Sequence, residues 1–251
     1  RNGVRAWTSQ AVHAGDVIET HLVETEPSDG ILPRPVPFSV VYEDDDILVV
    51  DKPADTPIHP SIGNYENTLA NGIAWYFEQK GEPFVYRCIN RLDRDTTGLI
   101  VLAKHALSAA VLSQAMRSRE IHRTYQAFAL GETAASGTID APIARLNGSL
   151  IQRTVDFASG ERSVTHYRTL AHCSVFSHLE LNLETGRTHQ IRVHMAYIGH
   201  PLLGDTLYNK TPGTFPRQAL HSASLSFVHP ITGEPLNFHA PLPEDMQNLL
   251  T

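Results

Sequence analysis

Residues 90–98, NRLDRDTTG, are followed directly by residues 99–104, LIVLAK, and the prediction of the fold starts from this segment. The second half is a short run rich in Leu, Ile and Val, which predicts a buried strand. The first half holds two carboxylates, two arginines and two hydroxyl groups, which predicts a polar loop ahead of that strand. A buried strand fixes the loop that feeds it, so Asp93 is a candidate for a firmly held reactive carboxylate. On these residues alone, an ordinary surface turn with Arg–Asp ion pairs stays open.

The composition indicates one large domain, with or without a small appendage. The chain has 251 residues, of which 41% are hydrophobic, enough for a packed core. Its net charge of −7 comes from residues 1–55, with eleven acids and four bases, whereas residues 56–251 are balanced. Sixteen of the basic residues are Arg and four are Lys, and arginine suits phosphate contacts and stacking. We therefore expect a local basic cleft on a protein that is acidic as a whole.

The sequence gives no indication of a membrane or metal protein. It has no run of 18 apolar residues and no charged-then-apolar leader at its start. Cys88 and Cys173 lack metal-ligand spacing and are expected to be reduced, as in a cytoplasmic protein. The fourteen histidines include no i, i+4 pair of a helical metal site. We expect no metal, no cofactor, no membrane partner and a monomer.

Apolar periodicity predicts helices and strands that mix without a regular βαβ alternation. Helices are expected over residues 68–79, 105–119, 188–198 and 243–250, with Thr68 as an N-cap and Gly81 as a stop. Besides the strand after Gly98, strands are expected over residues 40–42, 47–50, 121–130, 163–170, 175–183, 219–227 and 236–239. This order predicts an α+β fold with a mixed, largely antiparallel central sheet and flanking helices.

The chain divides into three parts by composition. Residues 38–251 form the expected main domain, and residues 25–37 form a Pro-rich linker. In residues 1–24, a Gly15-Asp16 turn precedes an alternating pattern that predicts a strand. This part resembles the end of an S4-like RNA-binding module, of which it would be a remnant, and a plain β-hairpin is the alternative.

Four segments, in order along the chain, resemble the RluA-type pseudouridine synthases. Residues 90–98 resemble the family signature His-Arg-Leu-Asp followed by Thr-Ser/Thr-Gly. The others are REIHRTYQA at residues 119–127, TGRTHQIRVH at residues 185–194 and LLGDTLY at residues 202–208. One such motif is weak, but four in the right order are specific. The resemblance runs from residue 38 to the C-terminus, and the family fold agrees with the α+β prediction.

The resemblance implies an RNA pseudouridine synthase. This reaction breaks the bond between ribose and uracil N1, turns the base and rejoins it through C5, without metal or cofactor. By the resemblance, Asp93 is the essential carboxylate and Arg187 is its ion-pair partner. Tyr125 packs on the uracil, and Ile191 lines the base pocket. Because the base must leave the RNA stack, Arg91 is expected to fill the gap it leaves.

Further residues are candidates for RNA contact, and two positions depart from the family pattern. Arg119, Arg123 and Arg192 are expected to contact phosphate groups, with a solvated-surface role as the alternative. Asn90 stands where the family usually has His, and it is expected to tune RNA contact or loop geometry. Asp55 stands where the family usually has Gly, but Asp tolerates a left-handed backbone. The expected partner is ribosomal RNA, ahead of transfer RNA.

Two other functions stay open at this point. A catalytically idle RNA-binding or assembly factor could keep the same fold. A glycoside hydrolase would need two carboxylates about 5 to 9 Å apart. Asp95 lies two residues from Asp93 and points elsewhere if the loop is extended, which disfavours the hydrolase.

Overall fold

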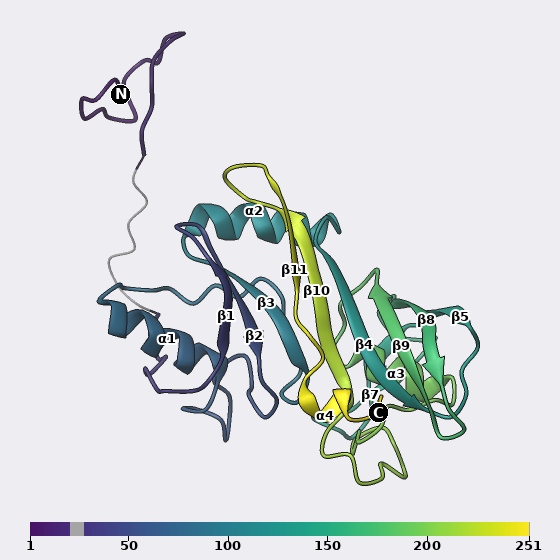
Figure 1. The fold of residues 1–251 in the computed structure, drawn as a ribbon. Coiled ribbons are helices and arrows are strands. Elements are labelled where there is room, and N and C mark those ends of the chain that lie inside the picture. The colour runs from purple at the N-terminus through teal and green to yellow at the C-terminus, as the bar shows by residue number, and fades with distance from the viewer. Residues whose placement is uncertain (21–27, 251) are drawn as a thin grey trace.

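A nine-stranded sheet forms the centre of the computed structural model, which describes residues 1–20 and 28–250 (Figure 1). The strand order is β1-β2-β3-β10-β4-β9-β8-β5. Strand β11 pairs with the part of β10 that follows the residues paired with β3. The strands of this sheet are β1 (Ser39–Glu43), β2 (Ile47–Lys52), β3 (Thr97–Ala103), β4 (His122–Leu130), β5 (Ser136–Asp140), β8 (Val164–His172), β9 (Phe176–Leu183), β10 (Leu220–Val228) and β11 (Pro235–His239). The helices are α1 (Leu69–Lys80), α2 (Ala106–Arg117), α3 (Gln190–Tyr197) and α4 (Glu244–Gln247). Among the strands that the structure describes, only β3 and β10 pair in parallel, so the predicted mixed, largely antiparallel α+β fold is confirmed.

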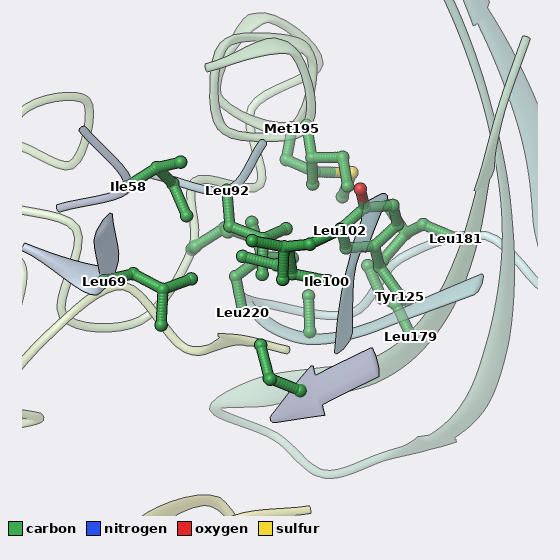
Figure 2. Packing of buried hydrophobic residues seen from close by; sticks show 14 of the residues in the cluster. Ile58, Leu69, Leu92, Ile100, Leu102, Tyr125, Leu179, Leu181, Met195 and Leu220 are labelled. Atoms are coloured by element: carbon green, nitrogen blue, oxygen red, sulfur yellow. The ribbon is translucent and has the colours of Figure 1, made fainter. Parts of the chain in front are cut away.

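Strand β3 lies in the core, as its apolar sequence predicts. All seven of its residues are buried, and its side chains alternate between two hydrophobic clusters. Ile100 and Leu102 pack into one cluster with the apolar face of α1, which Figure 2 shows from close by. Leu99 and Val101 pack into the other cluster, together with Leu112 of α2. Both faces of β3 are covered, in keeping with its apolar run at residues 99–103, and the buried strand holds the loop before it in place.

The helix ends follow from local sequence signals. Thr68 caps α1 in a capping box with Asn71, and Gly81 ends the helix in a left-handed conformation (φ 71°). Helix α3 begins at Gln190, two residues later than predicted, because His189 ahead of it is left-handed (φ 59°). Asp55 also has a positive φ of 54°, so the turn without the usual glycine does form.

Some of the predicted elements differ from the structure. Residues 1–20 contain the predicted turn near Gly15 but no strand. Three strands were not predicted: β5, and a two-stranded sheet of β6 (Ile143–Arg145) and β7 (Arg153–Val155). Helix α4 has four residues, shorter than the predicted 243–250. Residues 28–37 contain no helix or strand, and they bond to α1 through Asn71; residues 25–27 of the predicted linker lie outside the described residues. No helix in the described part of the chain has the length and hydrophobicity to span a bilayer.

Gly98 sits where β3 and β10 meet, and replacing it with Ala is expected to lower the free energy of unfolding. A Cβ atom at this position would lie 2.3 Å from the backbone oxygen of Ser222, and the φ of Gly98 is +110°. The backbone cannot yield as a flexible side chain can, so we expect Gly98→Ala to cost about 2–5 kcal/mol in urea unfolding.

Gly148→Ala is the matched control for this measurement. Gly148 also has a positive φ (+78°), but nothing lies within 4 Å of the position of an added Cβ. Only the backbone preference is then lost, at a cost of about 1–2 kcal/mol. Equal losses of stability in the two variants would mean that the close approach of β3 to β10 contributes nothing beyond the φ angle.

Candidate active site

One cleft of about 750 Å³ brings together all nine residues that the sequence singled out. It lies where the loop before β3, the start of β4, the end of β9 and the start of α3 converge. The nine residues are Asn90, Arg91, Asp93, Arg119, Arg123, Tyr125, Arg187, Ile191 and Arg192. They are spread over about a hundred positions in sequence, so the sheet topology is what makes them neighbours.

Asp93 is held by Arg192. The Nη1 group of Arg192 donates to Asp93 Oδ2 over 2.9 Å, and the Asp93 side chain keeps 23% of its surface exposed to the cleft. The Asp93 backbone oxygen accepts the N–H of Thr96, which closes the loop as a turn. The carboxylate is thus oriented by a guanidinium and remains open to a ligand.

Arg192 is itself clamped by Asp205, which is fully buried. Nε donates to Asp205 Oδ2 over 2.7 Å and Nη2 donates to Oδ1 over 2.9 Å, a bidentate pair. Burial alone would lower the pKa of Arg192, but bonds and charges of Asp205 and Asp93 raise it well above its ordinary value. Asp205 Oδ1 also accepts the N–H groups of Leu207 and Tyr208. The segment LLGDTLY therefore positions Arg192, a role not assigned to it from sequence.

The predicted pairing of Arg187 with Asp93 is wrong. Arg187 pairs with Glu161 over 2.5 Å and lies at the exposed rim of the cleft. The prediction that Arg192 contacts phosphate also disagrees with the structure, because Arg192 is buried and its guanidinium is already paired with the carboxylates of Asp93 and Asp205. Both arginines belong to the same motif, five residues apart, and only the fold determines which of them reaches Asp93.

Asn90 shapes the loop and does not reach out to a ligand. Its Oδ1 accepts the N–H of Val101 over 2.9 Å, and its Nδ2 donates to the carbonyl of Leu99 over 3.2 Å. The Asn90 amide thus bonds to the backbone of β3 as the backbone of a neighbouring strand would. Because Asn90 is buried and both ends of its amide are bonded, the structure favours an effect on loop geometry, one of the two predicted roles, over contact with RNA.

Tyr125 and Ile191 lie at once in the core and at the cleft. Both are 4% exposed and belong to the large cluster of Figure 2, where Tyr125 packs close to Leu181, its register partner on β9. Both also line the cleft. They form an apolar wall beside Asp93, against which a flat base could pack.

Two buried basic side chains, which the sequence analysis did not single out, bond to backbone carbonyl groups of the Asp93 loop. Lys52, on β2, is fully buried and donates to the carbonyl of Arg94 over 2.8 Å. Burial lowers the pKa of Lys52 to about 7, against the opposing charges of Asp95 and Asp93. Arg217 donates to the carbonyl of Asp95 over 3.1 Å. Lys52 precedes a proline in the sequence, a signal that could have been used, whereas nothing local marks Arg217.

His189 is a further residue that faces Asp93. Its Nδ1 bonds to the hydroxyl of Tyr208 over 2.7 Å, and that hydroxyl accepts the N–H of Arg153. The other ring nitrogen, Nε2, lies 3.9 Å from Asp93 Oδ2. Burial lowers the pKa of His189, while the charge of Asp93 opposes this shift. The cleft thus presents an imidazole nitrogen beside the carboxylate.

The only group in residues 1–20 and 28–250 with the geometry of a metal site lies outside the cleft. It consists of Asp44, Asp46 and His229. The Nε2 atom of His229 lies 3.0 Å from Asp44 Oδ2, which also accepts the hydroxyl of Tyr42. Its ligand atoms are engaged with each other and with neighbouring side chains, so these residues form a hydrogen-bonded cluster that ties the β1–β2 turn to the end of β10.

The chain is similar to known proteins over most of its length. Residues 46–197 match the family described as RNA pseudouridylate synthase. The chain is 42% identical over 250 residues to YjbO of Bacillus subtilis (strain 168), described as an uncharacterized RNA pseudouridine synthase; the match covers 99% of this chain and 88% of the relative. It is 43% identical over 251 residues to the ribosomal large subunit pseudouridine synthase D of Vibrio cholerae, over 94% of this chain and 76% of the relative.

The fold of this chain also resembles that of a solved structure. The human protein RNA Pseudouridylate Synthase Domain Containing 1 matches with a TM-score of 0.69 and 26% identity, over 86% of each chain. The family match includes the Asp93 loop, β4, β9 and α3, which together build the cleft. From the matched segment, the relatives and the fold, the chain belongs to the RNA pseudouridylate synthase family.

Proposed function

We propose that this pseudouridine synthase modifies uridine in ribosomal RNA and that Asp93 is its essential carboxylate. The observation that carries the proposal is the Asp93 carboxylate itself, oriented by Arg192 and open to the cleft beside the apolar wall of Tyr125 and Ile191. The choice of ribosomal RNA is supported by the name of the Vibrio relative, a ribosomal large subunit pseudouridine synthase. The two free cysteines agree with a cytoplasmic location, which we propose for this activity.

The reaction needs a carboxylate at the sugar and base, and groups that hold the uracil while it turns. The bond between N1 and C1′ breaks, the base rotates, and a bond forms between C5 and C1′; the C5 proton leaves and N1 regains a proton. Asp93 is held beside the Arg192 guanidinium and stays partly exposed, so it can serve at the sugar or at the base. Tyr125 and Ile191 offer a surface for the detached uracil, and the His189 imidazole offers a nitrogen for a hydrogen bond.

A uridine within a structured RNA must leave its stack to reach Asp93, which is 23% exposed within the cleft. Extrusion of a base costs a few kcal/mol. Arg91 is exposed, lines the cleft and lies two residues before Asp93. Its guanidinium could occupy the gap in the stack and offset part of this cost.

The two alternative functions are less well supported by the site. An idle binding protein would not need the Asp93–Arg192–Asp205 chain of ion pairs to be complete, yet it is. A glycoside hydrolase needs a second carboxylate that faces the substrate. Asp95 does not line the cleft, and its Oδ1 accepts the N–H of Asp55. Asp205 is fully buried against Arg192.

The test is tritium release from RNA labelled at C5 of uridine. Because pseudouridine formation removes the C5 hydrogen, the wild-type protein is expected to release tritium from large-subunit ribosomal RNA and not from transfer RNA. The same RNAs without enzyme set the baseline. Release from transfer RNA alone would refute the ribosomal assignment. No release from either class would favour the idle-binder alternative.

A further inference from the structure

A single carboxylate, that of Glu184, holds three N–H side chains at the rim of the cleft. Glu184 Oε2 accepts from Arg119 Nη1 over 3.4 Å and from Arg162 Nη2 over 3.1 Å. Its Oε1 lies 3.0 Å from Nε2 of His166, whose Nδ1 bonds to the hydroxyl of Thr138. We refer to Arg119, Arg162 and His166 together as the rim cluster.

The rim cluster does not stabilise the core. Its side chains are 56%, 55% and 44% exposed, and that of Glu184 is 34% exposed. Ion pairs this exposed contribute little to the free energy of folding. The three side chains come from separate places in the chain: after α2, before β8 and within β8. A convergence of donors that folding does not require points to a ligand.

The position of the rim cluster suits the substrate backbone. Arg119 and Glu184 line the same cleft as Asp93, and Arg123 lies against Gly186 next to them. Arg119 is itself left-handed (φ 64°) and follows the end of α2. The protein carries a net charge of −7, so attraction of RNA depends on such local groups of arginine.

We propose that Glu184 occupies the place of an RNA phosphate group in the free enzyme, and that the rim cluster binds this phosphate when substrate enters. The proposal rests on the RNA substrate proposed above. A phosphodiester group and a carboxylate both carry one negative charge and accept the same N–H donors. In exchange, Glu184 must turn away or repel the phosphate. Its presence therefore keeps the donors in place before binding and weakens binding of RNA.

The proposal predicts that Glu184→Gln binds RNA more tightly. One negative charge is lost at the rim, and the two arginines become available, so we expect affinity to rise about three- to tenfold at about 0.1 M salt. The slope of log Kd against log salt should become steeper by about 0.7–0.9, because no displaced carboxylate then takes up a cation when the phosphate binds. The measurement is fluorescence anisotropy of a labelled transcript of large-subunit ribosomal RNA over a salt series.

Two further variants separate phosphate binding from a general effect of charge. Glu66→Gln makes the same change of charge at an exposed pair with Arg34, outside the cleft, and should leave the affinity within about twofold. In an Arg162→Gln background, Glu184→Gln should give less than half of its gain, because the freed donor is absent. Weaker or unchanged binding by Glu184→Gln, or the same gain in both backgrounds, would overturn the proposal.

The same protein preparations also test the proposed function. If the wild type releases tritium from the transcript and Glu184→Gln does not bind it more tightly, the role of Glu184 is refuted and the synthase stands. If the wild type releases none from any RNA class while Glu184→Gln still binds more tightly, the phosphate site stands and the proposed catalysis is refuted. The two failures thus give different results.

Discussion

Asp93→Asn is expected to abolish tritium release from the RNA substrate while leaving the protein folded. An amide cannot act as a nucleophile or base at the uridine, so we expect a loss of at least about 10³-fold in rate. The fold should tolerate the change because the side chain is partly exposed and Arg192 keeps its bidentate bonds to Asp205. The free energy of unfolding should change by less than about 1 kcal/mol.

Asp95→Asn is the matched control for this loss. It removes the same charge two residues away, in the same loop, and keeps the Oδ1 atom that accepts the N–H of Asp55. Its rate should stay within about tenfold of wild type, because Asp95 does not line the cleft. Substantial activity in Asp93→Asn, or equal losses in both variants, would mean that Asp93 is not the essential carboxylate.

Arg192→Gln is expected to lower both stability and activity. Asp205 is fully buried, and without Arg192 its carboxylate would lack its partner, at a cost of about 3–5 kcal/mol. Asp93 would also lose the group that orients it, so tritium release should fall by at least about 10²-fold. Arg192→Lys keeps the charge but cannot make both bonds to Asp205, and it should recover only part of either loss.

A double variant separates the two effects of Arg192. In Arg192→Gln with Asp205→Asn, no unpaired charge is buried, so we expect about half or more of the lost stability to return. Activity should not return, because Asp93 is still without its guanidinium. Urea unfolding and tritium release on the same samples measure the two quantities. Return of activity together with stability would show that Arg192 acts only by stabilising the fold.

Much of the architecture could be predicted because it depends on local signals. The apolar run of β3, the Thr68 cap and the Gly81 stop each follow from a few adjacent residues. Strands β5, β6 and β7 were missed because they are short, and β5 also pairs with β8, a partner distant in sequence. Pairing of this kind leaves little trace in local periodicity.

The motifs alone identified the members of the site: nine residues from three of the four motifs, and all nine line the cleft. Their roles depend on tertiary contacts. Arg192 and not Arg187 holds Asp93, because the left-handed turn at His189 redirects the chain between them and buried Asp205 fixes the guanidinium. Asn90 supports β3, because its amide makes hydrogen bonds to the backbone of that strand. The reason is physical: motifs fix which side chains are present, whereas ion pairs form between groups that folding brings together, out of water.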